Sequence, residues 1–239
     1  MNYKKGNVAI AASIVVAGLI IAGAVMFTNK SSAPTTTNPT GSNNGQTDEG
    51  NVENLNPVDE NDWVRGNPDA EITIVEYSDT ECPYCNGAAP NNDGIHNTLK
   101  QVMDEYGDQV NWVYRHFAIK GQKATTAAHS LECAGEIGGN DIFWEYLDKV
   151  YKDAGDNNGT DTSKLSTYAQ EIGINVDEFN SCMEESRHID KIQEDIDNAV
   201  ATGGRGTPHS IIVAGDEKIV IPGAQPFQQW KSVIDSLLE

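Results

Sequence analysis

Two cysteines separated by two residues, in the run Cys82-Pro83-Tyr84-Cys85, are the side chains of this chain best suited to chemistry. Such a pair can alternate between a dithiol and a disulfide, and only a thiolate attacks another disulfide. Residues 72–77 are β-branched and apolar, which predicts a buried strand, and a helical apolar period is clear by residues 99–106. The pair is therefore expected at a helix N-terminus, where free N–H groups and the helix dipole stabilise a thiolate.

This placement assigns different roles to the two sulfurs. Cys82 is expected to be the solvent-facing nucleophile, and Cys85, one turn into the helix, the shielded resolving thiol. Pro83 suits a first helical turn, and Tyr84 is expected to tune the thiolate through its N–H group and its bulk. A structural disulfide or half of a zinc site are the alternatives. No second ligand pair stands at zinc spacing, so the motif predicts neither a metal nor a cofactor.

Three carboxylates precede the pair. Glu76 is predicted to lie buried beneath the cysteines, where its pKa would be raised and it could exchange protons with the inner thiol. The alternative is a strand-end glutamate that faces water. Asp79 and Glu81 are expected to point into solvent, because acidic groups beside Cys82 would raise its pKa.

The N-terminal part of the sequence predicts export. Residues 8–27 are uncharged and would span about 30 Å as a helix, which is the thickness of a bilayer core. Lys4 and Lys5 precede this stretch, so residues 1–7 are expected in the cytoplasm and everything after residue 27 outside. A cleaved signal peptide ending near Ala22-Gly23-Ala24 is the alternative, and it also exports the rest. Residues 28–61, rich in Thr, Asn, Ser, Gly and Pro, are predicted to be a disordered linker.

Net charge and cysteine content limit the classes of partner and the compartment that fit this chain. The 239 residues carry a formal net charge of −20. Most of the excess acidic charge lies after residue 61, which argues against nucleic acid or an anionic lipid surface as a partner. Four cysteines in an exported chain fit an oxidising compartment.

The remaining pattern predicts an α/β domain over residues 62–239. A strand, a helix interrupted between residues 86 and 94, and a second strand at 110–117 are followed by a helical block over about 119–202, a β-hairpin and a last helix. This order is that of a thioredoxin fold with an inserted all-helical domain. Cys133 and Cys182 fall on two different helices of the insertion. A structural disulfide is the favoured interpretation, with two buried free thiols as the alternative.

Several motifs together resemble those of the DsbA-like thiol:disulfide oxidoreductases, particularly the membrane-anchored forms. The resemblance covers nearly the whole exported part and rests on Glu76 with Cys82-Pro83-Tyr84-Cys85, Trp112-Val113-Tyr114-Arg115-His116-Phe117, Glu132-Cys133-Ala134, Phe143-Trp144-Glu145-Tyr146 and Gly206-Thr207-Pro208. It implies that Thr207 and Pro208 form the loop facing the active site, with the proline in cis and the backbone of Thr207 open to an extended client.

The resemblance also implies an activity. It points to a membrane-tethered, monomeric, extracytoplasmic enzyme that forms disulfides in reduced or unfolded exported proteins. A quinone-linked membrane protein of the DsbB or vitamin-K-epoxide-reductase type would reoxidise it. A reductase or isomerase of the same fold is the alternative within the enzyme class, and a non-catalytic thioredoxin-fold binding module is the alternative outside it.

Overall fold

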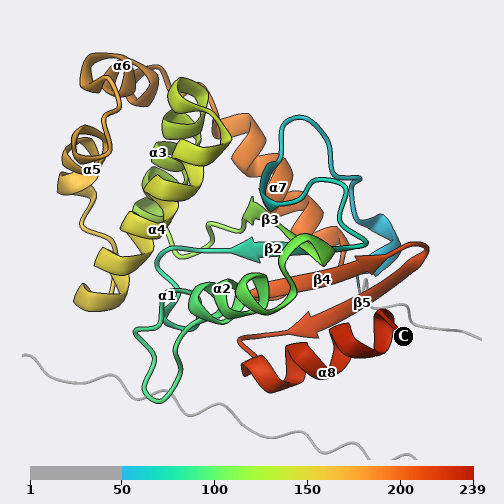
Figure 1. Ribbon diagram of the computed structural model, residues 1–239. Coiled ribbons are helices and arrows are strands. Elements are labelled where there is room, and N and C mark those ends of the chain that lie inside the picture. Colours follow the sequence, from blue (N-terminus) through green and yellow to red (C-terminus); the bar gives the residue numbers. More distant parts are fainter. Residues whose placement is uncertain (1–49) are drawn as a thin grey trace, which may run out of the picture. The chain divides into compact units, whose positions relative to one another are not determined.

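The computed structural model describes residues 50–239 and builds them around one mixed sheet (Figure 1). The strand order is β1-β3-β2-β4-β5, with β2 and β3 parallel and the other neighbours antiparallel. The strands are β1 (Trp63–Gly66), β2 (Ile72–Ser78), β3 (Val110–His116), β4 (His209–Ala214) and β5 (Glu217–Pro222). The predicted α/β thioredoxin fold is confirmed.

Helices cover both faces of this sheet. In Figure 1 the helices α2 and α8 lie together on the near face, and α7 passes behind the strands. The helices are α1 (Pro83–Asn86), α2 (Ile95–Tyr106), α3 (Gln122–Gly138), α4 (Asn140–Asn157), α5 (Leu165–Glu171), α6 (Val176–Glu185), α7 (Ile189–Ala201) and α8 (Phe227–Leu237), with 3₁₀ turns at Val52–Asn54, Gly107–Gln109 and Thr162–Lys164.

The alternation of side chains along β2 explains this two-sided packing. Successive residues of a strand point to opposite faces. Ile72 and Ile74 join the cluster that contains Leu99 of α2, whereas Val75 and Tyr77 join a second cluster on the α7 side. Every residue of β2 except one is buried, as expected for a central strand covered on both faces.

The helical insertion runs from α3 to α7, between β3 and β4 (Figure 1), as the sequence predicted. A disulfide between Cys133 of α3 and Cys182 of α6 closes a loop with a sequence separation of 49 residues. In the chain-entropy account a loop of that size adds about 4 kcal/mol of stability. Because the structure bonds the two sulfurs, the alternative of two free thiols is wrong.

The folded part begins before residue 62. Residues 50–61, predicted to belong to a disordered linker, hold a 3₁₀ turn and lie against the domain. Buried Arg115 donates to the carbonyl oxygens of Asn56 and Pro57, at 3.1 and 3.0 Å, and pairs with Asp62 at 2.7 Å. Asn198 of α7 adds bonds to the backbone of Asn54 and Asn56. The composition of the segment suggested a linker. The residues that hold it in place are distant in the sequence, so composition could not reveal them.

The predicted membrane span over residues 8–27 and the rest of the predicted linker, residues 28–49, lie outside the described residues. Within residues 50–239, no helix combines the length and the apolarity needed to cross a bilayer.

Removal of the Arg115 guanidinium tests this anchoring. We expect Arg115→Met to lower the free energy of unfolding by about 3–5 kcal/mol, because Asp62 would be left buried without its partner. Urea denaturation measures the loss, and limited proteolysis should show earlier cleavage within residues 50–61. Lys152→Met is the matched control, since the Lys152–Asp156 pair is exposed and should contribute almost nothing. Equal losses in the two variants would contradict the role given to Arg115.

Candidate active site

The cysteine pair lies at the carboxyl end of β2, on a one-turn helix. Cys82 is the N-cap of α1, and Pro83 occupies its first turn, where the missing N–H group costs nothing. The chain turns out of α1 at Gly87, which has a positive φ of 85°. A Cβ on Gly94 would come within 2.4 Å of the Gly87 nitrogen, so the loop between α1 and α2 closes on itself only with glycine there. The predicted interruption of the helix is confirmed. Because α1 has only one turn, nearby N–H groups stabilise a thiolate on Cys82 more than a long helix dipole does.

Cys82 is covered more than the sequence suggested. Only 2% of its surface is exposed, so the expectation of a solvent-facing sulfur is wrong. Its thiol donates to the carbonyl oxygen of Thr207 at 3.2 Å. The Thr207–Pro208 peptide is cis, as the resemblance implied. The loop predicted to face the active site is therefore also the cover of Cys82.

The pKa of Cys82 is lowered from 9.0 to about 6. The largest cause is a hydrogen bond from the thiol of Cys85 to the Cys82 sulfur. Thr207 and the backbone N–H groups of Tyr84 and Cys85 lower it further, whereas burial opposes the shift. The hydroxyl of Thr207 is buried without another partner, which leaves it available to the thiolate. Both cysteines are free thiols in this structure.

Cys85 has the opposite environment. It is completely buried, and burial is the first cause that raises its pKa well above the usual value. The hydrogen bond it gives to Cys82, and the negative charges on Cys82 and Glu76, raise it further. At neutral pH the pair therefore holds one negative charge, on Cys82, and one proton, on Cys85.

Glu76 is fully buried, as predicted, and lies among the side chains beneath the pair. One carboxylate oxygen accepts a bond from the indole nitrogen of Trp112 at 2.9 Å. Burial is the main cause that raises the pKa of Glu76 from 4.5 to about 7. The alternative of a glutamate facing water is wrong.

Sequence reasoning missed Ser78. It lies two residues after Glu76 on β2, and its hydroxyl lowers the pKa of both Glu76 and Cys85 by hydrogen bonding. The hydroxyl of Tyr151 donates to Ser78 at 2.8 Å and lies 3.2 Å from that of Tyr114. The signal for Ser78 was present, because residues two apart on a strand share a face. Tyr151 carried no such signal, since it comes from α4 of the insertion.

The two carboxylates nearest the motif do not both face solvent. Asp79 is only 1% exposed, so the expectation for it is wrong. Its side chain accepts from the backbone N–H groups of Ile119 and Lys120, both at 3.0 Å, and from Glu81 at 2.9 Å. Glu81 is partly exposed and accepts from the N–H group of Thr160. Both carboxylates hold loops around the motif, which the local sequence did not reveal.

The surroundings of the sulfurs include uncovered apolar surface and a shallow groove. Tyr84 is 55% exposed beside Cys82, and Ile119 is 47% exposed on the loop held by Asp79. A cavity of about 510 Å³ is lined by Thr207, Pro208, His209 and residues of β5. This surface can accept an extended apolar segment next to Cys82.

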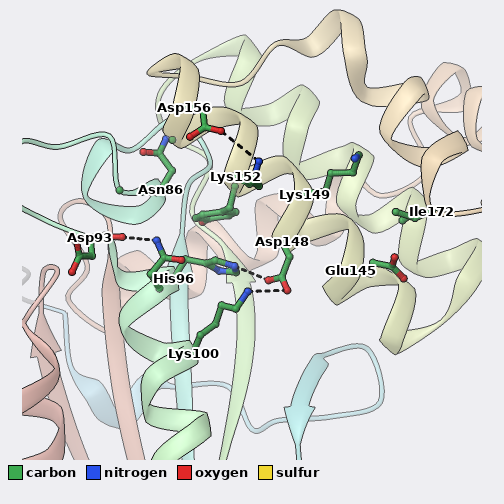
Figure 2. A pocket seen from close by; sticks show the side chains of 14 residues that line it. Asn86, Asp93, His96, Lys100, Glu145, Asp148, Lys149, Lys152, Asp156 and Ile172 are labelled. Carbon is green, nitrogen blue, oxygen red and sulfur yellow. Dashed lines mark hydrogen bonds and ion pairs between the residues drawn. The ribbon is translucent and has the colours of Figure 1, made fainter.

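A second cavity, of about 710 Å³, lies among α1, α2 and α4 (Figure 2). Neither the cysteines nor Thr207 and Pro208 line it, so it does not adjoin the loop that covers Cys82. Figure 2 shows Asp148 joined to both His96 and Lys100, and Lys152 joined to Asp156. These charges neutralise one another within the wall.

Comparison with known proteins agrees with this geometry. The family model described as Thioredoxin matches residues 58–236. This chain belongs to the thioredoxin family. Among solved structures, DsbA2 of Pseudomonas aeruginosa matches with a TM-score of 0.60 and 27% identity over 76% of this chain and 97% of that one. BdbD of Bacillus subtilis in its oxidised form matches with a TM-score of 0.64 and 20% identity, covering 77% of this chain and 96% of that one. The chain thus has the DsbA-like form of the thioredoxin fold.

Curated relatives have a different overall organisation. A Na(+)/H(+) antiporter NhaA 1 of Salinispora arenicola is 32% identical over 67% of this chain but only 23% of its own length. An antiporter of Herminiimonas arsenicoxydans is 33% identical over 64% of this chain and 22% of its own length. The chain therefore spans about a quarter of the length of the curated relatives it matches.

The ionisation of Cys82 can be measured by alkylation. In the fully reduced chain, the rate of reaction of Cys82 with iodoacetamide should rise with a midpoint near pH 6. Cys85→Ala should move this midpoint toward the ordinary value of 9.0, because it removes the largest cause of the shift. Mass spectrometry of the labelled peptide gives the rate. The double variant Cys133→Ser/Cys182→Ser is the control and should keep the midpoint. A midpoint unmoved by Cys85→Ala would contradict the assignment.

The raised pKa of Glu76 predicts a pH-dependent stability. Between pH 4.5 and about 7 the folded state keeps the Glu76 proton that the unfolded state has lost, so the free energy of unfolding falls as pH rises. A pKa moved from 4.5 to about 7 corresponds to about 3 kcal/mol. As pH rises between these values, the free energy of unfolding of Glu76→Gln should therefore increase relative to that of wild type by about 3 kcal/mol. Urea denaturation of both proteins, with Cys82 and Cys85 kept reduced as in the structure, measures the difference, and parallel curves would contradict it.

Proposed function

We propose that this chain is an extracytoplasmic oxidase that introduces disulfides into exported proteins. In its oxidised form, a client thiolate attacks the sulfur of Cys82 and displaces Cys85 as the leaving thiolate. The client's second thiol then attacks the mixed disulfide. The client loses two electrons and two protons as its disulfide forms, and the enzyme is left with two thiols.

The lowered pKa of Cys82 is the observation that carries this proposal. Hydrogen bonds that stabilise the Cys82 thiolate stabilise the reduced enzyme relative to the disulfide, which makes the disulfide a stronger oxidant. A lowered pKa also makes Cys82 a good leaving group when the client's second thiol attacks. A reductase needs the opposite bias, and this is why the reductase alternative ranks lower.

Neighbouring groups support the two exchange steps. Glu76, whose pKa lies near neutrality, can take up and return the proton of Cys85. The backbone of Thr207 can pair with an extended client, and Pro208 holds that loop in place. Pro83 starts the helix, and exposed Tyr84 offers an apolar contact beside the reacting sulfur. The exposed surface next to a reactive sulfur favours these roles over a non-catalytic binding module.

Location and partners follow from the same proposal. We propose that residues 8–27 anchor the chain in the membrane, with residues 1–7 in the cytoplasm and the catalytic domain outside. Each turnover leaves two electrons on the enzyme, so a quinone-linked membrane protein of the DsbB or vitamin-K-epoxide-reductase type is proposed to remove them. The strong net negative charge disfavours nucleic acid. The enzyme is proposed to act as a monomer.

A reduction potential and a refolding assay test whether the enzyme oxidises or reduces its client. In a glutathione buffer series the Cys82–Cys85 couple should lie well above thioredoxin, whose potential is about −270 mV, and toward DsbA at about −120 mV. The oxidised chain should also restore activity to reduced, unfolded ribonuclease. Cys82→Ser and Cys85→Ser should each abolish this, because neither variant can form the Cys82–Cys85 disulfide that accepts the client's electrons.

The double variant Cys133→Ser/Cys182→Ser, which keeps the motif, is the control and should still oxidise the client. Ribonuclease recovery that persists in Cys82→Ser would contradict the mechanism. A potential close to that of thioredoxin would indicate a reductase instead.

A further inference from the structure

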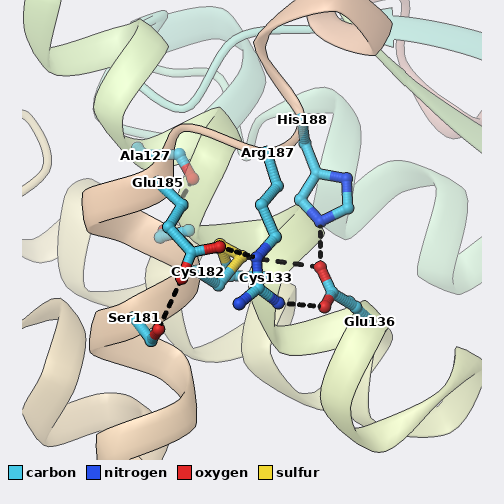
Figure 3. The surroundings of a disulfide bond; sticks show 9 residues. Ala127, Cys133, Glu136, Ser181, Cys182, Glu185, Arg187 and His188 are labelled. Carbon is cyan, nitrogen blue, oxygen red and sulfur yellow. Dashed lines mark hydrogen bonds and ion pairs between the residues drawn. A yellow bond between two sulfur atoms is a disulfide. The ribbon is translucent and has the colours of Figure 1, made fainter.

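Metal-ligating side chains surround the disulfide of the insertion. His129, Cys133 and Cys182 each offer one ligand atom, and these atoms all lie within 4.8 Å of one another. Glu136, Cys182 and His188 form a second such group that shares the Cys182 sulfur. Figure 3 shows Glu136, Arg187 and His188 gathered beside the two sulfurs. The two groups meet at the Cys182 sulfur, and together they hold two sulfurs, two imidazoles and a carboxylate.

Helix α3 presents three of these side chains on one face. Residues at positions i, i+4 and i+7 of a helix lie above one another, and His129, Cys133 and Glu136 have this spacing. Cys182 faces them from α6, with its sulfur 3.7 Å from a carboxylate oxygen of Glu136. A similar separation is expected between two ligand atoms of a tetrahedral zinc ion, given bonds of about 2.0–2.3 Å.

One ring nitrogen of His129 makes no hydrogen bond in the structure. The residue is only 4% exposed, and its Nε2 atom has no hydrogen-bond partner. Buried polar nitrogens are normally bonded, so an orphaned imidazole beside two sulfurs calls for a ligand. This is an observation independent of the spacing along α3.

The outer side of the cluster already holds a positive charge. Arg187 donates to Glu136 and Glu185, and His188 lies 2.6 Å from Glu136. The Arg187 side chain is 37% exposed, so it can move away without leaving a buried charge behind. A cation bound at Glu136 would replace Arg187, and His188 would hold the carboxylate from behind, as outer partners of metal ligands do.

We propose that, when the Cys133–Cys182 disulfide is reduced, His129, Cys133, Glu136 and Cys182 bind one Zn²⁺ ion. A dithiol supplies the reduction: the S–S bond breaks, two thiols form in the protein, and the dithiol becomes a disulfide. The metal then displaces the two thiol protons to solvent. This site goes beyond thiol oxidation at Cys82, and it does not depend on the direction of that reaction.

The consequence is that α3 and α6 stay joined in both redox states. In the oxidised chain a covalent bond joins them, and in the reduced chain four metal–ligand bonds take its place. Structural zinc stabilises small folded units strongly, so the reduced insertion is held by metal where the disulfide is lost.

Cobalt spectroscopy tests the site directly. The full chain with Cys82→Ser/Cys85→Ser leaves Cys133 and Cys182 as its two cysteines. Reduced with a phosphine, it should bind one Co²⁺ per chain and show tetrahedral bands with thiolate-to-cobalt charge transfer. The same protein in its disulfide form is the matched control and should show no charge-transfer band. Zn²⁺ should displace the cobalt.

Single substitutions identify the ligands. His129→Ala and Glu136→Ala should each weaken Co²⁺ binding by at least about tenfold, and Cys182→Ser should remove the charge-transfer band of a two-thiolate site. Arg187→Gln should tighten binding, because Arg187 competes for Glu136. Glu184→Gln, an exposed carboxylate of α6 outside the proposed site, is the matched control and should bind Co²⁺ as the parent does.

Where the reduced chain stays folded, two results would overturn the proposal. One is a reduced, folded chain that gives no charge-transfer band with Co²⁺. The other is binding equally strong in the parent, His129→Ala and Glu136→Ala, because the cysteines alone would then suffice. If circular dichroism shows that reduction unfolds the insertion, recovery of the helical signal on adding Zn²⁺ supports the site. No recovery under that condition overturns it.

Discussion

The hydrogen bond from the thiol of Cys85 to the sulfur of Cys82 is the interaction on which the rest of the site depends. Three acidic groups lie close together here, and burial allows only limited charge among them. Cys85 and Glu76 are completely buried, which disfavours their charged forms, whereas Cys82 has donors from Cys85, Thr207 and backbone N–H groups. The negative charge therefore settles on Cys82. Exchange chemistry needs this asymmetry, since one sulfur must attack or leave as a thiolate while the other stays protonated.

The sheet and the insertion form this environment together. Alternation along β2 places Glu76 and Ser78 on the same face as the apolar residues packed against α2. The insertion then contributes Tyr151 of α4, whose hydroxyl reaches Ser78. The helical domain is thus part of the active site. A thioredoxin fold without it would lose one hydrogen-bond partner beneath the cysteines.

The sequence predicted the parts of the site that depend on local pattern. The strand before the motif, the break after Asn86, buried Glu76 and the cis Pro208 all follow from residue types, spacing or family resemblance. It failed where distant partners decide the outcome. The cover over Cys82 comes from a loop 125 residues away, and the inward turn of Asp79 follows from backbone donors at Ile119 and Lys120. Composition alone could not show that residues 50–61 are held by Arg115 and Asn198.

Helix α3 connects the sheet to the insertion through two consecutive residues. Glu132 is nearly buried and accepts bonds from Trp63 of β1 and His116 of β3, and it also pairs with Lys191 of α7. His116 holds its carboxylate, which keeps the pKa of Glu132 at about 2 despite burial. The next residue, Cys133, joins α3 to α6. One end of this connection is electrostatic and fixed to the catalytic sheet, and the other is covalent. Any loosening of α6 on reduction would therefore reach the sheet through α3 only against the hydrogen bonds of Glu132 and its ion pair with Lys191.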